Sequence, residues 1–218
     1  MNHGFVSSSS TAGTVFAFAG QTTAGPISAA MNDDSVVGIA ADRYGFTLGL
    51  LGPLGPSPAA ISIGATVGQY VDVHLGTAST GPFTGINGGA PAAAVRFTDS
   101  ASGNSFGVVN IGGGVKGTAV TASIVGDGSP DLVVGGQAGV NLPLYVIDGA
   151  VIPTMSGSVN LATRPPGVGT VSVPGRMPSG WTGYTIGTII PDSNGDTYAD
   201  FAVGEFTTST AGRVVVFH

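Results

Sequence analysis

The sequence repeats a β-rich unit at an interval of about 70 residues, and this repetition constrains the fold more than any other feature. Each unit opens with the pattern Gly-x-(Thr/Ala)-apolar-(Gly/Thr). It continues after a turn with a short apolar strand that ends in glycine, and it closes with another β-rich strand. The segments are 45–49, 60–64 and 70–76 in one unit, 117–121, 131–135 and 144–149 in the next, and 183–187, 200–204 and 213–218 in the last. Such regularity predicts a fold assembled from similar β-sheets.

A partial fourth copy opens the chain, because Ser10–Phe18 matches Ser209–Phe217 in its pattern of small and apolar residues. The chain therefore begins and ends in the last strand of a unit. We predict one all-β, β-propeller-like domain over residues 1–218, with about three blades and an N-terminal outer strand that belongs to a shared blade. The predicted units lie at approximately 21–76, 77–149 and 150–218, and the outer strand lies within 1–20. A β-solenoid and a β-sandwich with duplicated hairpins remain alternatives.

The connections between these segments are long, and one of them contains further apolar runs. Residues 92–98 and 106–111 alternate in a way that is typical of strands. They are either parts of loops or additional strands of the sheets.

The composition excludes helical bundles and coiled coils. The chain contains 38 glycines and 14 prolines, so turns must be frequent. Lys116 is the one lysine and Glu205 the one glutamate, which leaves two of the strongest helix formers almost absent. Short strands joined by many turns are the remaining solution.

The charge pattern excludes nucleic acid as a partner. The net charge is −6, and the six basic residues are scattered along the sequence rather than clustered. Nucleic-acid binding requires a basic footprint, and the sequence has none. Cysteine is absent, so the chain can form neither disulfides nor a thiolate metal site.

Residues 44–71 carry no charge over a stretch longer than the roughly 20 residues of a membrane-spanning helix. Pro53, Pro56 and Pro58 interrupt this stretch, so uncharged strands joined by a turn explain it better than a membrane span. The N-terminus shows no basic segment followed by an apolar one, and no signal peptide is visible. We expect the protein to lie at an extracellular or virion surface. A virion protein reaches that surface during virion assembly and needs no signal peptide.

The loop 192–200 carries the most informative chemistry. Oxygen-bearing side chains stand at its positions 1, 3, 5 and 9, and Gly195 permits a sharp bend. This spacing wraps a loop around one Ca²⁺ ion, which prefers six to eight oxygen ligands. The predicted ligands are the side chains of Asp192, Asn194, Asp196 and Asp200 and the backbone carbonyl of Tyr198. An EF-hand is excluded because Val203 stands at position 12, and a solvated turn without metal is the alternative.

The preceding unit carries an equivalent but weaker loop at 123–131. Its candidate ligands are Ser123, Asp127, Ser129 and Asp131, while Val125 stands at the third position. The unit 21–76 has Pro56 and Ala60 at the matching places. We therefore expect a weaker second calcium site at 123–131 and none in the unit 21–76.

The segment 183–218 resembles the FG-GAP repeat of the integrin α-chain β-propeller and its bacterial relatives. The resemblance rests on the acidic loop 192–200 and on the closing strand Val214–Phe217, and it weakens in the earlier units. In that family the calcium loops are structural, and ligands bind at the opposite face or at insertions. The resemblance therefore implies calcium as a structural cofactor and blades that stack around an axis.

Catalytic groups are scarce in the sequence. His74 shares a strand face with Asp72 and Tyr70, but no nucleophile accompanies it, so we expect a structural or interface role. The leading hypothesis is a non-enzymatic, calcium-stabilised surface module for assembly, adhesion or glycan binding, such as a phage virion decoration or spike component. A secreted bacterial adhesin domain and a fragment of an FG-GAP-containing hydrolase or lyase are the alternatives.

The incomplete repeat predicts that the protein assembles with other chains. A propeller ring typically needs four or more blades, and the sequence shows three units and one outer strand. We therefore expect a homo-oligomer or a larger protein assembly, with 14–18 as the exchanged strand. The surface ligand would be a cell-surface glycan or protein, with neither nucleic acid nor a membrane span involved.

Overall fold

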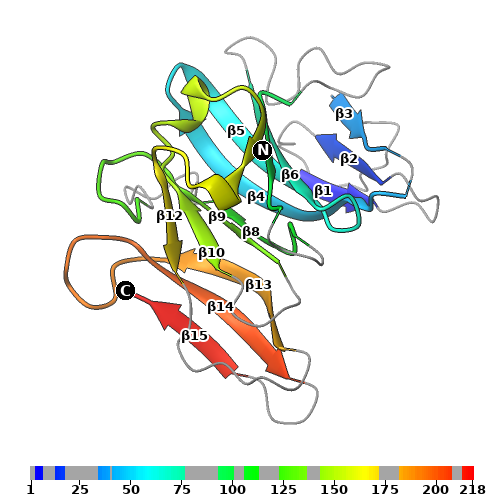
Figure 1. Cartoon of the computed structure of the whole chain (residues 1–218). Coiled ribbons are helices and arrows are strands. Elements are labelled where there is room, and N and C mark those ends of the chain that lie inside the picture. The colour runs from blue at the N-terminus through cyan, green and yellow to red at the C-terminus, as the bar shows by residue number, and fades with distance from the viewer. Residues whose placement is uncertain are drawn as a thin grey trace, which may run out of the picture.

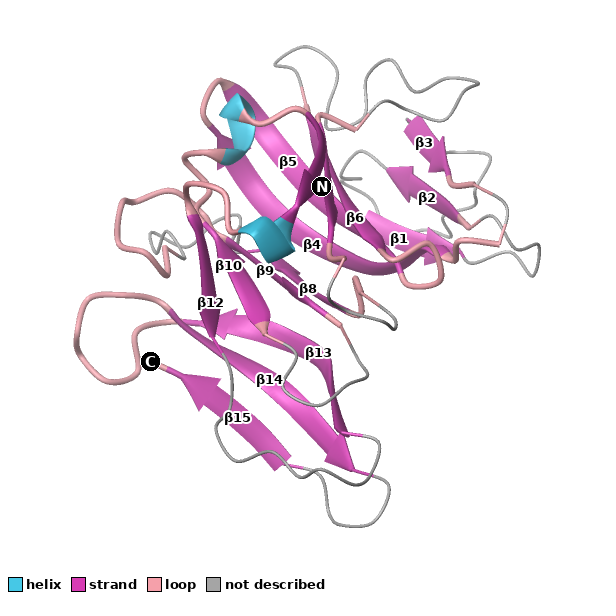
Figure 2. Cartoon of the chain, in the orientation of Figure 1, coloured by secondary structure: helices cyan, strands magenta, loops and turns pink. Residues whose placement is uncertain are grey.

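The computed structural model shows an all-β protein whose strands form four separate sheets (Figure 1). It describes residues 3–6, 13–17, 34–39, 41–76, 93–100, 106–112, 123–136, 143–171, 182–207 and 213–218. Among these residues the helical structure consists of two short 3₁₀ turns (Figure 2). The first prediction of the sequence, an all-β fold, is confirmed.

The first two sheets contain the N-terminal part of the chain. Sheet 1 has the order β1-β2-β3, with β1 at His3–Val6, β2 at Thr14–Ala17 and β3 at Asp34–Val37. Sheet 2 has the order β11-β7-β6-β5-β4. Its antiparallel strands are β4 (Tyr44–Leu54), β5 (Ser57–Ala65), β6 (Tyr70–Leu75) and β7 (Val95–Thr98). The last strand, β11 (Gly157–Asn160), comes from a later connection and pairs with β7 in parallel.

The other two sheets contain the C-terminal part. Sheet 3 has the order β12-β10-β9-β8, with β8 at Val109–Gly112, β9 at Leu132–Gly135, β10 at Leu144–Ile147 and β12 at Val168–Val171. Sheet 4 has the order β13-β14-β15, with β13 at Thr182–Ile190, β14 at Asp200–Thr207 and β15 at Arg213–Phe217. The two 3₁₀ turns, Ile152–Thr154 and Leu161–Thr163, lie on either side of β11 in the connection from β10 to β12.

The sheets pack face to face in chain order, and each contact has its own apolar core. Alternation along the strands puts successive side chains on opposite faces, so one sheet contributes to two cores. Sheet 1 meets sheet 2 through Val15, Tyr44, Ile61, Ile63, Ala65 and Tyr70. Sheet 2 meets sheet 3 through a larger core that includes Val71, Val73, Phe97, Leu132, Val134 and Ile147. Sheet 3 meets sheet 4 through Val109, Ile111, Val133, Leu144, Val146, Phe201 and Val203.

Glycine is required where the first two sheets approach most closely. Gly13 has a φ of 51°, and a Cβ at this position would collide with the carbonyl oxygen of Tyr44. The amide of Gly38 also donates to the Gly13 carbonyl at 3.0 Å. Only a residue without a side chain allows this backbone contact.

The described strands form four sheets, none of which closes into a ring, and this differs from the predicted three blades and one outer strand. The segment 14–17 lies in the middle of sheet 1 and pairs with β1 and β3, so it is not a lone outer strand. The first strand of sheet 3 is β8, which overlaps the run 106–111, whereas the predicted segment 117–121 lies outside the described residues. The other strand-like run, 92–98, contains β7, which is therefore a strand of sheet 2. The short strands β1 and β3 carry too few residues for a clear local pattern, and pairing defines them.

The uncharged stretch 44–71 forms the hairpin of β4 and β5 and the start of β6, as the prolines predicted. No helix in the described part of the chain is long and apolar enough to cross a membrane.

One face of sheet 2 buries a polar network beside the core with sheet 1. A hydrogen bond of 2.8 Å joins the Tyr44 hydroxyl and His74 Nε2. Arg96 donates two hydrogen bonds to the carboxylate of Asp72, at 2.7 and 2.8 Å. The guanidinium carbon of Arg96 lies 3.7 Å from the centre of the Tyr70 ring. His74 is only 3% exposed, so its ring is buried beside these groups.

We expect His74 to make the protein acid-sensitive below neutral pH. Burial lowers the pKa of His74 to about 4, whereas the unfolded chain has a pKa of about 6.5. Between these values the unfolded state binds the proton and the folded state does not, so the free energy of unfolding falls as pH decreases. The full loss is about 3 kcal/mol near pH 4. Urea denaturation from pH 7 to 4.5 measures this slope, and His74→Gln should flatten it; equal slopes would contradict the prediction.

Candidate metal centre

The two acidic loops of the sequence lie side by side in the structure. The loop 123–131 precedes β9, and the loop 192–200 joins β13 to β14. The Ala199 amide donates to the Ser123 carbonyl at 3.0 Å, which connects the two loops. The Tyr198 ring lies against Gly126 and leaves no space for a Cβ there. Both loops therefore belong to one region where sheets 3 and 4 meet.

Ser123 organises the loop 123–131. Its hydroxyl oxygen accepts the amides of Gly126, Asp127 and Gly128 at 2.9, 3.1 and 3.3 Å. The same hydroxyl donates to Asp127 Oδ1 at 3.1 Å, and that oxygen also accepts the Ser129 amide at 2.8 Å. The loop therefore folds around one buried hydroxyl, and Asp127 is held at its exposed side.

Three carboxylates converge beside this loop. One oxygen from each of Asp127, Asp131 and Asp148 lies within 4.8 Å of the other two. Oxygens that bind the same Ca²⁺ ion at about 2.3–2.6 Å stand up to about 5 Å apart, so this spacing fits a calcium ion. Asp127 is exposed, Asp148 is partly buried and Asp131 is fully buried. The described residues thus present a half-open acidic site with the chemistry of a hard-cation site.

Asp148 is a candidate ligand that the sequence reasoning missed. It follows β10, and Ile147 at the end of that strand pairs with Leu132, the neighbour of Asp131. Antiparallel pairing therefore places Asp148 beside Asp131, although they are far apart in sequence. The sequence signal for this ligand was an acidic residue near the end of the predicted closing strand 144–149.

The electrostatics of the cluster favour a cation. Burial raises the pKa of Asp131, and the charge of Asp127 raises it further. Hydrogen bonds from the amides of Gly149, Val125 and Ile124 oppose that effect. The hydrogen bond from the Ser129 amide lowers the pKa of Asp127. The carboxylates are thus supported mainly by neutral donors, which leaves their mutual repulsion for a cation to offset.

The loop 192–200 is closed on itself. Asp192 Oδ1 accepts the amides of Asn194, Gly195 and Asp196 at 3.2, 2.6 and 3.2 Å, and Oδ2 accepts the Thr197 amide at 2.8 Å. These bonds, led by the one from Thr197, lower the pKa of Asp192. The predicted first ligand therefore already accepts four amides of its own loop, and Oδ2, which accepts one of them, has room for a further partner.

The other predicted ligands of this loop hydrogen-bond one another. Asn194 Nδ2 donates to Asp196 Oδ2 at 2.9 Å, and the Asp196 amide donates to Asn194 Oδ1 at 3.0 Å. The Tyr198 amide donates to Asp196 Oδ1 at 2.9 Å. Asn194, Asp196 and Tyr198 are exposed, so a cation could reach them from solvent.

Asp200, at the end of this loop, accepts hydrogen bonds from its start. Its Oδ2 accepts the amide of Ser193 at 2.8 Å and also the Ser193 hydroxyl, and it lies 3.2 Å from His218 Nδ1. The hydroxyl of Ser193 makes the largest contribution to lowering the pKa of Asp200. Asp200 Oδ1 is buried and has no hydrogen-bond partner among the described residues, whereas Asp131 Oδ1 accepts the Gly149 amide at 2.8 Å. The two equivalent aspartates thus differ in one unsatisfied oxygen.

Sheet 2 carries no acidic loop at the matching place. Pro56 lies in the two-residue turn between β4 and β5, and Ala60 is buried in the core against sheet 3. Leu75 pairs with Ala60 at the position that Asp148 occupies beside Asp131. An apolar pair therefore stands where sheet 3 has the acidic pair.

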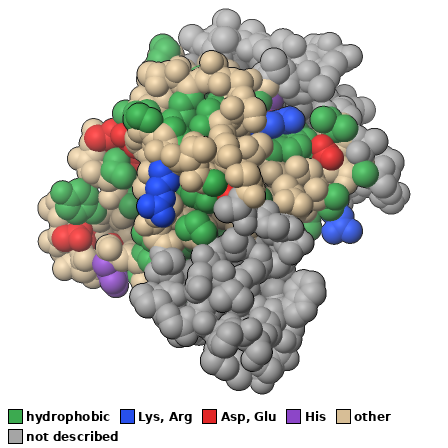
Figure 3. Space-filling view, in the orientation of Figure 1, with side chains coloured by type: hydrophobic (Ala, Val, Ile, Leu, Met, Phe, Trp, Pro, Cys, Tyr) green, Lys and Arg blue, Asp and Glu red, His purple; other side chains and the backbone are tan. Residues whose placement is uncertain are grey.

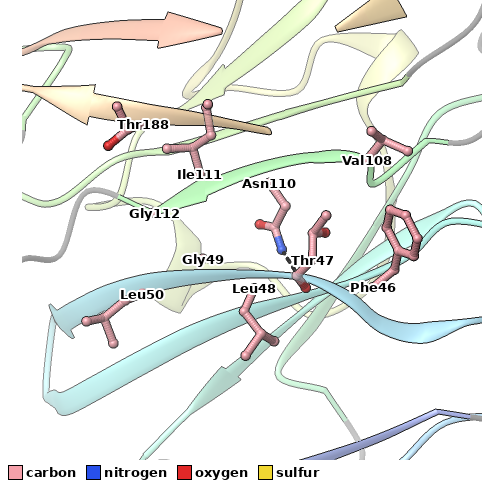
Figure 4. A pocket seen from close by; sticks show the side chains of 11 residues that line it. Phe46, Thr47, Leu48, Gly49, Leu50, Val108, Asn110, Ile111, Gly112 and Thr188 are labelled. Carbon is pink, nitrogen blue, oxygen red and sulfur yellow. Dashed lines mark hydrogen bonds between the residues drawn. The ribbon is translucent and has the colours of Figure 1, made fainter. Parts of the chain in front are cut away.

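A cavity of about 300 Å³ lies between β4, β8 and β13, which are edge strands of sheets 2, 3 and 4 (Figure 4). Its lining includes Phe46, Leu48 and Leu50 from β4, Asn110 and Ile111 from β8, and Thr188 from β13. The Asn110 amide donates to the Thr47 carbonyl at 3.4 Å, and Asn110 Oδ1 accepts from Ser62 at 2.6 Å. Among the described residues, the lining contains no ionisable side chain.

On the face shown in Figure 3, charged side chains are few and scattered among apolar and uncharged ones. This agrees with the scattered charges of the sequence.

Comparison of the sequence with models of known protein families finds no match. A search of curated proteins likewise finds no similar sequence.

Proposed function

We propose that the protein is a non-enzymatic, calcium-stabilised structural module that serves in assembly, adhesion or glycan binding at an extracellular or virion surface. The observation that carries this proposal is the convergence of Asp127, Asp131 and Asp148 beside a loop that folds around Ser123. Its architecture would be that of a β-propeller built from FG-GAP-like blades. The face-to-face stacking of four sheets and the position of the acidic loops before the second strand of a sheet support this assignment.

Calcium at this place would stabilise contacts that lie far apart in the sequence. Asp131 precedes β9, Asp148 follows β10, and Asp127 belongs to the loop that touches the loop 192–200. An ion bound by all three would fix two strand ends and one loop, and through that loop it would support the contact of sheets 3 and 4. The role of such an ion would be structural.

The loop 192–200 is proposed as a second cation site with Asp192, Asn194, Asp196, Asp200 and the Tyr198 carbonyl as ligands. The buried and unsatisfied Oδ1 of Asp200 supports it. The four amide donors on Asp192 already offset part of its negative charge, which weakens its attraction for a cation. We therefore expect the cluster with Asp148 to bind more tightly than the loop 192–200.

Calcium should raise the melting temperature of the protein. A ligand that binds only the folded state stabilises it by about 2.7 kcal/mol at 100 times its Kd. For a chain of this size that corresponds to an increase of about 5–10 °C. Thermal unfolding in EGTA and in Ca²⁺ at 100 times the Kd measures the effect. Calorimetric titration gives the Kd, which we expect near the 10⁻⁴–10⁻³ M of extracellular modules, so the required Ca²⁺ concentration is about 10–100 mM.

Matched variants locate the ion. Asp148→Asn should remove most of the calcium response and weaken binding at least about tenfold, because it removes a charged ligand from the cluster. Asp196→Asn makes the same chemical change in the loop 192–200 and should leave most of the response. If Asp196→Asn loses the calcium response and Asp148→Asn keeps it, the ion binds in the loop 192–200 instead. No calcium response in the wild-type protein would overturn the proposal.

A further inference from the structure

Equivalent positions of three sheets border the cavity between β4, β8 and β13. The second strands of sheets 2, 3 and 4 align through Gly64, Gly135 and Gly204. The pairing partners of the two residues before each glycine are Leu48 and Gly49 on β4, Asn110 and Ile111 on β8, and Gly187 and Thr188 on β13. All of these partners line the cavity. The cavity therefore lies where the repeated sheets converge.

Strand edges rather than strand faces border the cavity. The consecutive residues 46–50 of β4 all line it, although successive side chains of a strand point to opposite faces. The strands β4, β8 and β13 each pair with a neighbour in their sheet on one side only, and such an edge keeps backbone N–H and C=O groups outside the ladder. The carbonyl of Thr47 is one of them, because it accepts the Asn110 amide of β8. The cavity thus offers neutral backbone groups for hydrogen bonding.

The lining runs from exposed to buried side chains. Phe46 is 55% exposed and Leu50 is 37% exposed, and Thr188 is also exposed. Asn110 and Ile111, in contrast, are 7% and 6% exposed. A ligand therefore reaches the cavity from solvent past Phe46 and ends at the buried amide of Asn110.

Asn110 holds a neutral hydrogen-bond donor at the cavity. The Ser62 hydroxyl donates to Asn110 Oδ1 at 2.6 Å, which fixes the amide with Nδ2 towards β4 (Figure 4). Nδ2 carries two hydrogens, and its one acceptor among the described residues, the Thr47 carbonyl, lies at the long distance of 3.4 Å. A buried amide with an unused hydrogen costs free energy, and an oxygen of a ligand would remove that cost.

We propose that this cavity binds one neutral monosaccharide unit, with an apolar C–H face of the sugar against Phe46 and one of its oxygens on the Asn110 amide. The volume of about 300 Å³ lies at the lower end of the range of about 300–1,000 Å³ for ligand pockets, so the cavity suits one small ring. The described lining carries no charge, so a charged ligand would lose its hydration without gaining a counter-charge. A sugar places neutral hydroxyls around an apolar ring, and the lining combines aliphatic, aromatic, amide and backbone groups in the same way.

This inference rests on the glycan-binding part of the proposed function, for which it names the site and the class of ligand. It does not involve the metal centre, because none of the carboxylates of that centre lines the cavity. The titrations are therefore carried out in EGTA. A failure of sugar binding would leave the calcium response of Asp148→Asn as expected, so the two proposals fail separately.

Titration of the isotope-labelled protein with sugars, followed by amide NMR shifts, is the first test. The probes are the methyl glycosides of glucose, galactose, mannose and N-acetylglucosamine. At least one should shift amides of residues 46–50 and 110–112 in a saturable way, with a Kd on the order of 1 mM, because a single ring buries little surface. The corresponding disaccharides distinguish a glycan unit, which binds in both forms, from a free sugar, which binds only as the monosaccharide.

Two further probes test the chemistry of the site. Glucuronate and glucosamine have the same ring with a charge, and cyclohexanol has a ring of six atoms with a single hydroxyl. Each should bind at least about tenfold more weakly than the best neutral sugar. Tighter binding of cyclohexanol would make the cavity an apolar site, and tighter binding of a charged sugar would contradict the argument from charge. Either result, or the absence of saturable shifts with all four glycosides, would overturn the proposal.

Variants at the exposed rim locate the sugar. Thr188→Trp should raise the Kd at least about tenfold, because the indole occupies the entrance, and Phe46→Ala should raise it about two- to tenfold through loss of the aromatic face. The matched controls are Ser158→Trp, at an exposed position of the edge strand β11, and Val67→Ala, in the exposed turn between β5 and β6. Both controls should keep the wild-type Kd. Unchanged binding in Thr188→Trp would place the sugar elsewhere and refute the assignment.

A buried variant tests the amide. Asn110→Leu installs the residue that β4 carries at the equivalent position, Leu48, and should raise the Kd about tenfold by removing the donor. The Ser62 hydroxyl keeps an acceptor in this variant, because it also contacts the Gly49 carbonyl at 3.3 Å. Wild-type affinity in a folded Asn110→Leu protein would remove Asn110 from the site, and the two rim variants decide the proposal if this variant does not fold.

Discussion

Replacing Arg96 with methionine should lower the free energy of unfolding by about 3–5 kcal/mol. Arg96 donates two hydrogen bonds to Asp72, which is only 2% exposed. Removing the guanidinium leaves this carboxylate buried without its cation, and that desolvation cost dominates the effect. The loss of contact with the Tyr70 ring adds a smaller amount.

Urea denaturation at pH 7 measures this loss, and a second substitution tests its cause. Adding Asp72→Asn to Arg96→Met removes the uncompensated charge and should recover part of the stability, so that the double variant is more stable than the sum of the single effects predicts. Val67→Met, at an exposed turn, is a control that should change stability by less than about 0.5 kcal/mol. A loss below about 1 kcal/mol in Arg96→Met would mean that the ion pair is not a major stabilising contact.

Replacing Asp131 with alanine should lower the free energy of unfolding by about 3–5 kcal/mol even in EGTA. The carboxylate is fully buried and accepts the amides of Ile124 and Val125 at 2.6 and 2.9 Å and of Gly149 at 2.8 Å. Without it, three backbone donors in the loop and the turn lose their acceptor. The same substitution should also abolish the calcium response, because it removes the innermost carboxylate of the cluster.

Asp200→Ala is the matched comparison, because Asp200 begins β14 as Asp131 precedes β9. Asp200 accepts one backbone amide, that of Ser193, and its other partners are the Ser193 hydroxyl and the His218 ring, so its loss leaves fewer backbone donors without an acceptor. We expect this variant to lose about half as much stability as Asp131→Ala in EGTA. Chemical denaturation of the two proteins side by side decides the order, and a larger loss in Asp200→Ala would contradict the hydrogen-bond argument.

The strands that the repeat predicted are present where their local pattern is strong. The segments 45–49, 60–64 and 70–76 lie in β4, β5 and β6, and the last unit matches β13, β14 and β15 in the same way. In these strands β-branched residues alternate between two faces and turn residues separate them, so the signal is local. The number of sheets was not predictable in this way. The strands β1 and β3 have four residues each, and only pairing with a neighbour makes them strands.

The candidate site was likewise predictable only where its ligands are close in sequence. The spacing of acidic and small residues identified the two loops, because a loop that surrounds a cation needs its ligands close in sequence. The sequence could not assign Asp148 to the loop 123–131, since antiparallel pairing of β9 and β10 brings that residue to Asp131. Nor could it show that Asp192 is satisfied by amides of its own loop.

The sequence by itself determined the all-β class, the absence of a basic surface and the location of the acidic loops, because composition and short-range spacing decide these properties. The tertiary structure alone decided which strands share a sheet, which carboxylates meet, and which valines stay exposed. Val71 and Val214 have the same local setting, yet one is buried and the other is 70% exposed. The difference arises from the sheet that covers Val71, and packing between distant segments is not encoded in the residues on either side of a position.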